Sequence, residues 1–343
     1  MRSYRRSLRF LNPWLYVLLA SFLIFGGGIL FAAKPVVKLG TLKLVGSAPI
    51  FIALEKGYFD EEGLDVKVEW FTAAAPVSVA VASGDLDVGA TGITATFYNS
   101  VASGAKMYLV ADRGMERPGY PLNALVVNKA LYDSGTIRSL KDLKGKKIGL
   151  STLGSTFHYQ IGKLLEQEGM SLKDVELTPL RTMPIMIDAV RKGTVPAVIL
   201  SPPWGAVAEE EGWGKVLFWV GDKLTNQVVG VFYSEKMRNN RELGVRFMKA
   251  YIKALHYYYD ACLAKPRGAH YDEVIDIIAK YIGQDRKSIE RSLSYIDRDG
   301  RLYLPDLIAQ QEWYVKNGLC KTVVPLEKFT DMSFVEEAAK QLK

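Results

Sequence analysis

Residues 38–67 read KLGTLKLVGSAPIFIALEKGYFDEEGLDVK and predict a strand, a loop, a short helix and a second strand in that order. Residues Val36–Val45, which begin just before this stretch, alternate apolar and polar side chains as a strand does. Ser47 is an N-cap candidate with a proline two positions later, and Gly57 stands where a helix needs a left-handed residue to end it. This order is typical of the start of a parallel α/β fold, and the loop after the first strand is a candidate ligand loop.

Composition and charge exclude several classes of protein. The chain has 343 residues, of which 49% are hydrophobic, and its length suits two lobes of ordinary domain size. The net charge is +7, and four of these charges belong to Arg2, Arg5, Arg6 and Arg9. The remainder is too weakly basic for a nucleic-acid binder, and no arginine cluster is interleaved with aromatic residues. We therefore expect no nucleic-acid partner. We also expect the protein to be a monomer.

The N-terminus is typical of an export signal. The uncharged apolar run Trp14–Ala33 follows the arginines and is long enough to span a bilayer. No good cleavage site precedes Lys34, so residues 1–33 are interpreted either as a signal peptide or as an uncleaved membrane anchor. The positive-inside rule places the globular part in the periplasm or on the outer face of the cytoplasmic membrane.

Three further motifs carry a family resemblance together with the GYF…EGL element at residues 57–64. They are SGDLDVG at 83–89, LKDLKGKKIG at 140–149 and AVRKG at 189–193. These motifs resemble the nitrate, sulfonate and taurine type of periplasmic substrate-binding protein, a family that also holds thiamine-pyrimidine precursor binders and pyrimidine synthase. The resemblance covers nearly everything after Pro35. It implies an α/β, type II periplasmic-binding-protein fold with a ligand cleft between two lobes, and an ABC permease as partner.

The strand and helix pattern predicts how the lobes are divided. Residues 34–112 form the first part of lobe 1, residues 113–228 form lobe 2 with its flanking crossovers, and residues 229–343 return to lobe 1 with the C-terminal helices. The segment Arg113–Pro121 is expected to be a loop and the first crossing, because it contains two prolines and two glycines between predicted strands.

The loops after successive strands supply the expected ligand wall. The loop before the helix at 157–168 is rich in hydroxyl residues, and its backbone N–H groups form a site for a carboxylate or sulfonate. The alternative is that a hydroxyl there only caps the helix. Trp204 follows two prolines and either faces the ligand or packs the wall between the lobes. The candidate ligand-binding residues are Ser47, Ala48, Phe51, Gly92, Ile93, Thr94, Thr152, Gly154, Ser155, Thr156, Phe157, Trp204 and Gln227. Arg113 and Arg117 either add charge to the site or face solvent.

No catalytic site is expected. The pyrimidine-synthase branch of the resembled family works with a lysine, a histidine and a cysteine-rich motif, whereas this chain has only Cys262 and Cys320. Phosphate-loop, dinucleotide and hydrolase motifs are absent, and the three histidines lack zinc spacing. We expect neither a cofactor nor a metal.

The expected ligand is a small organic anion. Many members of the resembled family carry acidic residues near Pro196-Ala197 and before the Pro-Trp pair, and this chain has none at those positions. That difference favours an anion or an uncharged ring over a cationic ligand. The sequence thus predicts delivery of a sulfonate or carboxylate to an ABC importer. The alternatives are a neutral pyrimidine-type thiamine precursor and, less favoured, a pyrimidine-synthase-like enzyme.

Overall fold

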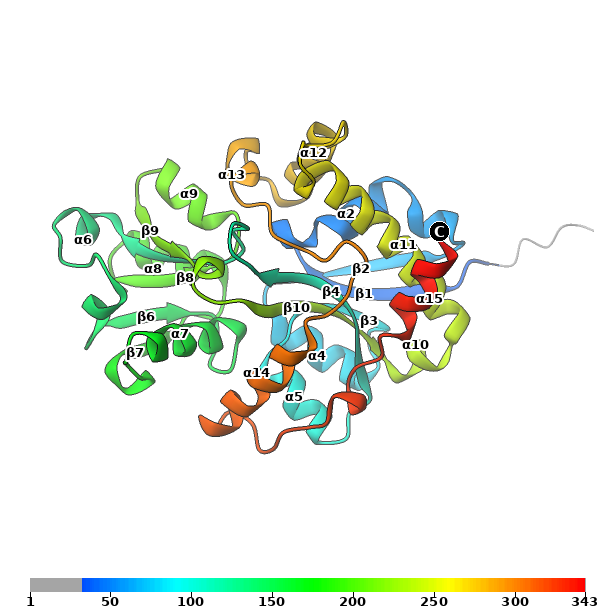
Figure 1. Ribbon diagram of the computed structural model, residues 1–343, viewed down its shortest axis with the longest axis horizontal. Coiled ribbons are helices and arrows are strands. Elements are labelled where there is room, and N and C mark those ends of the chain that lie inside the picture. Colours follow the sequence, from blue (N-terminus) through cyan, green and yellow to red (C-terminus); the bar gives the residue numbers. More distant parts are fainter. Residues whose placement is uncertain (1–32, 343) are drawn as a thin grey trace, which may run out of the picture. The chain divides into compact units, whose positions relative to one another are not determined.

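The computed structural model describes residues 33–342 (Figure 1). The chain divides after Lys34 into two compact units, and the second, Pro35–Lys343, contains all the helices and strands described below. The predicted signal peptide or anchor at residues 1–33 lies outside the described residues, apart from Ala33. Within residues 33–342, no helix has both the length and the apolar character needed to cross a membrane.

Two five-stranded sheets form the framework, in the orders β2-β1-β3-β10-β4 and β7-β6-β8-β5-β9. The first contains β1 (Val36–Leu42), β2 (Asp65–Phe71), β3 (Val88–Gly92), β4 (Met107–Glu116) and β10 (Asn226–Ser234). The second contains β5 (Ala124–Asn128), β6 (Lys147–Leu150), β7 (Glu176–Pro179), β8 (Ala197–Leu200) and β9 (Gly214–Trp219). In each sheet four strands run in the same direction, and the fifth, β10 or β5, is antiparallel to both of its neighbours. This antiparallel strand follows directly after the chain has crossed from the other sheet.

Helices cover both faces of each sheet (Figure 1). Around the first sheet, α2, α11 and α12 lie on one face and α4, α5 and α14 on the other; α7, α8 and α9 cover the second sheet. The bounds are α2 Ala48–Glu55, α3 Tyr58–Glu61, α4 Ala74–Ser83, α5 Ala95–Ala102, α6 Lys129–Asp133, α7 Thr156–Gln167, α8 Met183–Arg191, α9 Trp204–Glu210, α10 Glu235–Asn239, α11 Arg241–Tyr258, α12 Tyr271–Ile282, α13 Arg286–Glu290, α14 Leu304–Lys316 and α15 Ser333–Gln341.

Apolar side chains of the helices and strands form the cores. Phe51 on α2 is fully buried, and its ring stacks on Tyr281 of α12 at 4.4 Å between centroids. Cys262 and Cys320 are both free and buried, and they belong to the clusters on opposite faces of the first sheet. The two cysteines are therefore not paired.

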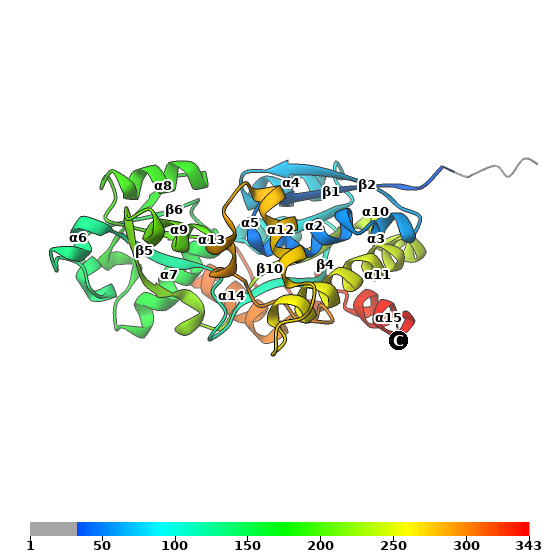
Figure 2. The same cartoon turned by 90° about the horizontal axis from the view of Figure 1, so that it is seen from above.

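The two sheets lie side by side, with β4 and β10 running toward the junction between them (Figure 2). Strand β4 pairs with β10 from Met107 opposite Ser234 to Glu116 opposite Asn226. The prediction that residues 113–121 form a loop is wrong for residues 113–116, because β10, more than a hundred residues later, supplies their ladder partner. The lobe boundaries at 112/113 and 228/229 stay a prediction.

A buried polar network occupies this junction. The Asp112 carboxylate accepts hydrogen bonds from Gln227 Nε2 at 2.6 Å and from the backbone N–H groups of Gly114 and Asp297 at 2.7 Å. The Glu116 carboxylate accepts from the Asn123 N–H at 3.1 Å and from Gln160 Nε2 at 3.0 Å. Burial raises the pKa of Asp112 to about 6. The network supplies hydrogen-bond partners to polar groups that would otherwise be costly to bury, although Glu116 Oε2 has none within residues 33–342.

Candidate functional site

A cavity of about 80 Å³ lies between the two sheets. The first sheet and its loops contribute Leu42, Leu44, Thr72, Ala73, Ala74, Thr91, Gly92, Arg113 and Val229, and the second sheet and its loops contribute Ser151, Phe157, Arg181, Met183, Met186 and Ser201. Most of these residues lie at or just beyond the carboxyl ends of the parallel strands β1, β2, β3, β6, β7 and β8. Ligands of open α/β sheets bind at such strand ends.

Arg113 on β4 is the buried cation of this cavity. Its side chain is only 2% exposed, and it forms no ion pair with any residue in the described range 33–342. Its Nη2 donates a hydrogen bond to Ser47 Oγ, and Ser47 Oγ in turn donates to the Leu42 carbonyl at 2.5 Å. The buried Nε has no hydrogen-bond partner among the residues that the structure describes. Burial lowers the pKa of Arg113 to about 10, so the side chain is still charged at neutral pH.

Arg181 brings a second cation to the cavity from the other sheet. It lies between β7 and α8 and has a left-handed backbone, with a φ of 67° that a non-glycine residue adopts at a cost. Its backbone N–H donates to the Ser151 carbonyl at 2.8 Å, which fixes the turn. The side chain is exposed and has no ion-pair partner within residues 33–342.

Of the predicted ligand-binding residues, Gly92 and Phe157 line the cavity. Ser47 stands behind it, as the hydrogen-bond partner of Arg113. Ala48, Phe51 and Ile93 are buried in hydrophobic clusters on either face of the first sheet. Thr94 is the N-cap of α5 and accepts a hydrogen bond from the Phe97 N–H at 3.4 Å.

The predicted residues at the start of α7 lie where the two lobes touch. Ser155 is the N-cap, and its hydroxyl accepts a hydrogen bond from the His158 N–H at 3.3 Å. The Gly154 carbonyl accepts from the Ala95 N–H at 2.8 Å, and the Ser155 carbonyl accepts from Tyr314 Oη at 3.0 Å. Thr152, Gly154, Ser155 and Thr156 do not line the cavity.

Trp204 and Gln227 also lie off the cavity. Trp204 is the first residue of α9 and packs, partly buried, against the core of the second sheet. Gln227 is buried, and its side chain is fully engaged: Nε2 donates to Asp112 and Oε1 accepts from the Tyr303 N–H at 2.8 Å.

The segment that carries Arg181, Met183 and Met186 is not among the elements predicted from the sequence. Neither β7 nor α8 was predicted, and Arg181 lies between them. One signal was available, because Thr182 precedes Met183-Pro184 and a threonine before an early helical proline indicates a helix start.

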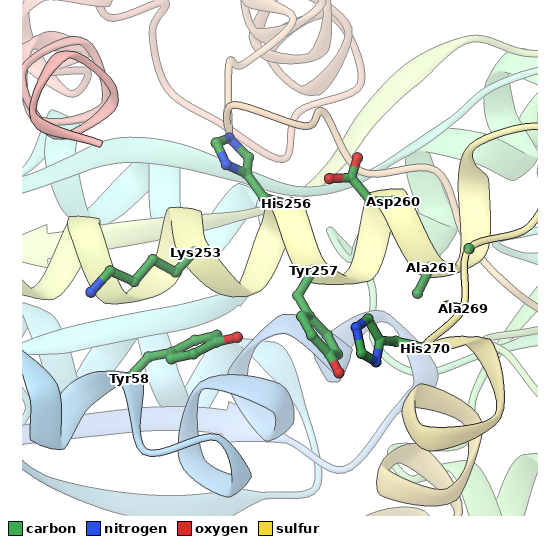
Figure 3. Close-up of a pocket in the computed structure, with 9 residues that line it drawn as sticks. Tyr58, Lys253, His256, Tyr257, Asp260, Ala261, Ala269 and His270 are labelled. Atoms are coloured by element: carbon green, nitrogen blue, oxygen red, sulfur yellow. The ribbon is translucent and has the colours of Figure 1, made fainter. Parts of the chain in front are cut away.

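A larger pocket of about 440 Å³ lies beside α11, away from the junction of the sheets (Figure 3). Its titratable side chains are paired: His256 Nε2 is 3.0 Å from Asp299, and Lys253 Nζ is 2.9 Å from Glu62. Figure 3 shows the rings of Tyr257 and His270 side by side, with centroids 4.8 Å apart. This pocket offers a ligand no buried unpaired charge, in contrast to the cavity at Arg113.

A family model described as NMT1/THI5 like matches residues 45–269. The chain belongs to this family. A curated relative, the 4-amino-5-hydroxymethyl-2-methylpyrimidine phosphate synthase of Aspergillus parasiticus, is 27% identical over 275 residues, which cover 74% of this chain and 73% of the relative.

Two solved structures share the fold at lower identity. The ligand-binding component of an ABC-type import system from Staphylococcus aureus, with zinc bound, has a TM-score of 0.73 and 17% identity, and the match covers 89% of this chain and 99% of that one. The alkanesulfonate-binding protein SsuA from Xanthomonas axonopodis pv. citri, bound to MOPS, has a TM-score of 0.70 and 20% identity over 87% and 99% of the two chains. The predicted two-lobed α/β fold is confirmed. In residues 33–342, no group of three or more His, Cys, Asp or Glu side chains has a metal-binding arrangement.

Proposed function

We propose that this protein is an extracytoplasmic solute-binding protein that delivers a small organic anion to an ABC importer. One observation carries the proposal: the cavity lies between two lobes, both lobes line it, and a buried cation faces it. Such a site encloses its ligand when the lobes close about the crossing strands. The rest of the lining is mostly apolar, from Leu42, Met186 and their neighbours, which suits a short carbon skeleton attached to the charged group.

The similar proteins support this role. Both solved structures are named as ligand-binding proteins, one of an ABC-type import system and one for alkanesulfonates. A permease in the cytoplasmic membrane is accordingly the proposed partner, and the outer side of that membrane the proposed location. The cavity volume of about 80 Å³ favours a small solute, because pockets for drug-sized ligands measure about 300–1,000 Å³.

A second candidate function follows from the Aspergillus parasiticus relative, which is named as a pyrimidine phosphate synthase. The protein would then bind a neutral pyrimidine, or act on one. The lining opposes catalysis, because the cavity residues of the described chain include no lysine, histidine or cysteine to act as base or nucleophile. His158 lies behind the loop, where its Nδ1 accepts a hydrogen bond from the Gly154 N–H at 3.0 Å.

The test is a thermal-shift screen of the full-length chain against alkanesulfonates, small carboxylates and pyrimidines, followed by calorimetry and by NMR of the recovered compound. A bound anion at about 100 times its dissociation constant should stabilise the fold by about 2.7 kcal/mol. The compound should be recovered unchanged. Steady conversion of a bound compound, or binding of pyrimidines alone, would refute the proposal.

A further inference from the structure

The start of α4 opens onto the cavity without a side-chain cap. Its N-cap residue is Ala73, at a position where serine, threonine, aspartate or asparagine is preferred. Ala73 and Ala74 line the cavity, and no side chain caps the helix. The N–H groups of Ala74 and Ala75 lie at the positive end of a ten-residue helix, whereas Pro76 has no N–H to satisfy.

Arg113 lines the same cavity and provides the second, independent observation. A guanidinium that is 98% buried pays a large desolvation cost, which is normally offset by a carboxylate or another anion. In residues 33–342 Arg113 has only the Ser47 hydroxyl as a hydrogen-bond partner, and its buried Nε has none. An anion in the cavity would supply the missing partner.

The remaining lining fits the same kind of ligand. Thr91, Ser151 and Ser201 also line the cavity, and a hydroxyl group can donate a hydrogen bond to an anion. No aspartate or glutamate is among the cavity residues of the described chain, so nothing there repels an anion. Arg181 lines the cavity from the second sheet, whereas Arg113 lines it from the first.

The start of α7 is a less favourable binding site for the anion. Ser155 already caps that helix, and the Gly154 N–H already donates to His158 Nδ1. The Gly154 and Ser155 carbonyls are engaged by Ala95 and Tyr314 of the other lobe. At the start of α4, by contrast, no side chain caps the helix, so its first N–H groups are available to a ligand.

We propose that Arg113 and the uncapped start of α4 seat the anionic head of the solute, a sulfonate or carboxylate, and that Arg181 covers it from the second lobe. This inference rests on the proposed function. Ser47 acts as a positioning residue, because it holds the Arg113 guanidinium through Nη2 and is itself held by the Leu42 carbonyl. The apolar remainder of the solute then lies against Met183, Met186 and Phe157.

Calorimetry with 2-bromoethanesulfonate, on full-length wild type and variants, tests the seat. Arg113→Met should weaken binding by about 10- to 100-fold, the usual effect of losing hydrogen bonds between a cation and an anion. Arg113→Lys should retain part of the affinity, because lysine keeps the positive charge but lacks the parallel N–H donors of the guanidinium group. Arg117→Met is the matched control: Arg117 directly follows β4 but lies over the Tyr295 ring and outside the cavity, so affinity should not change.

A second measurement does not depend on the folding of a variant. In wild-type crystals soaked with the same compound, the sulfonate oxygens should lie within hydrogen-bond distance of Arg113 and the Ala75 N–H, with anomalous bromine density toward Met186. A sulfonate at the start of α7, or a folded Arg113→Met variant with wild-type affinity, would overturn the inference but not the proposed function. The proposed function fails separately if the wild type binds none of the screened anions.

Discussion

Asp306 provides a test of how the buried junction controls stability. It lies on the first turn of α14 and is 7% exposed. Its Oδ2 accepts hydrogen bonds from the Gln227 N–H at 2.7 Å and from Gln310 Nε2 at 2.6 Å, and its Oδ1 accepts from Tyr159 Oη at 3.1 Å. Because burial disfavours the charged form, the pKa of Asp306 is raised to about 6.

The sign of the pH effect follows from that shift. The unfolded chain loses the proton near pH 3.8 and the folded chain near pH 6, so the folded state binds more protons between these values. The contribution of Asp306 to stability is therefore greatest at low pH, falls as the pH rises through this window, and is constant above it. Between pH 5 and pH 7 the loss is about 1 kcal/mol.

Asp306→Asn should remove this loss. Asparagine imitates the protonated carboxyl, since its oxygen can accept from Gln227 and Gln310 while its NH₂ group donates to Tyr159 Oη. Urea unfolding of the wild type and the variant at pH 5, 6 and 7 measures the difference. The advantage of the variant over the wild type should grow by about 1 kcal/mol from pH 5 to pH 7. His158, whose buried ring has its pKa lowered to about 4, titrates in both proteins and cancels in the comparison. Parallel pH profiles for the two proteins would refute the assignment of a raised pKa to Asp306.

Two further substitutions test the contact between the lobes. Ser155→Ala should lower the free energy of unfolding, measured with urea, by about 1 kcal/mol, because it removes the cap of α7. It should leave the anion affinity, measured by calorimetry, unchanged. A large loss of affinity would indicate that the anion binds at the start of α7. Gly162→Ala should destabilise by about 1–3 kcal/mol, because a methyl group there would lie 2.0 Å from Trp313 Cζ2 and force α14 away from α7. Gly46→Ala, whose added carbon meets no atom within 4 Å, is the control in thermal unfolding; equal melting temperatures for the two alanine variants would contradict the packing argument.

Local patterns in the sequence predicted the elements that depend on short-range chemistry. Gly57 has the expected left-handed φ of 70°, and α2 ends at Glu55 as the apolar pattern indicates. The sequence also predicts the start of α7 and two alternative roles for Ser155, ligand contact and helix cap. The structure shows the capping hydrogen bond, whereas a role in ligand binding stays a prediction.

The rest depends on residues that are distant in the sequence. Residues 113–116 are a strand only because β10 pairs with them, and no pattern within Arg113–Pro121 indicates that partner. The importance of Arg113 likewise depends on Ser47, 66 residues earlier, and on its having no ion-pair partner within residues 33–342. Sequence analysis could name the arginine as a candidate. It could not show that the side chain is buried and lacks an ion-pair partner within residues 33–342.

The central claim, that the cavity recognises a negative charge, is tested most directly by comparing one solute with and without that charge. Calorimetry on the full-length wild type would measure the dissociation constants of 1-propanesulfonate and 1-propanesulfonamide, which differ little in shape. We predict that the sulfonate binds at least about tenfold more tightly, since charged hydrogen bonds contribute about 1.5–3 kcal/mol. Equal affinities for the two compounds, or tighter binding of the sulfonamide, would contradict the claim.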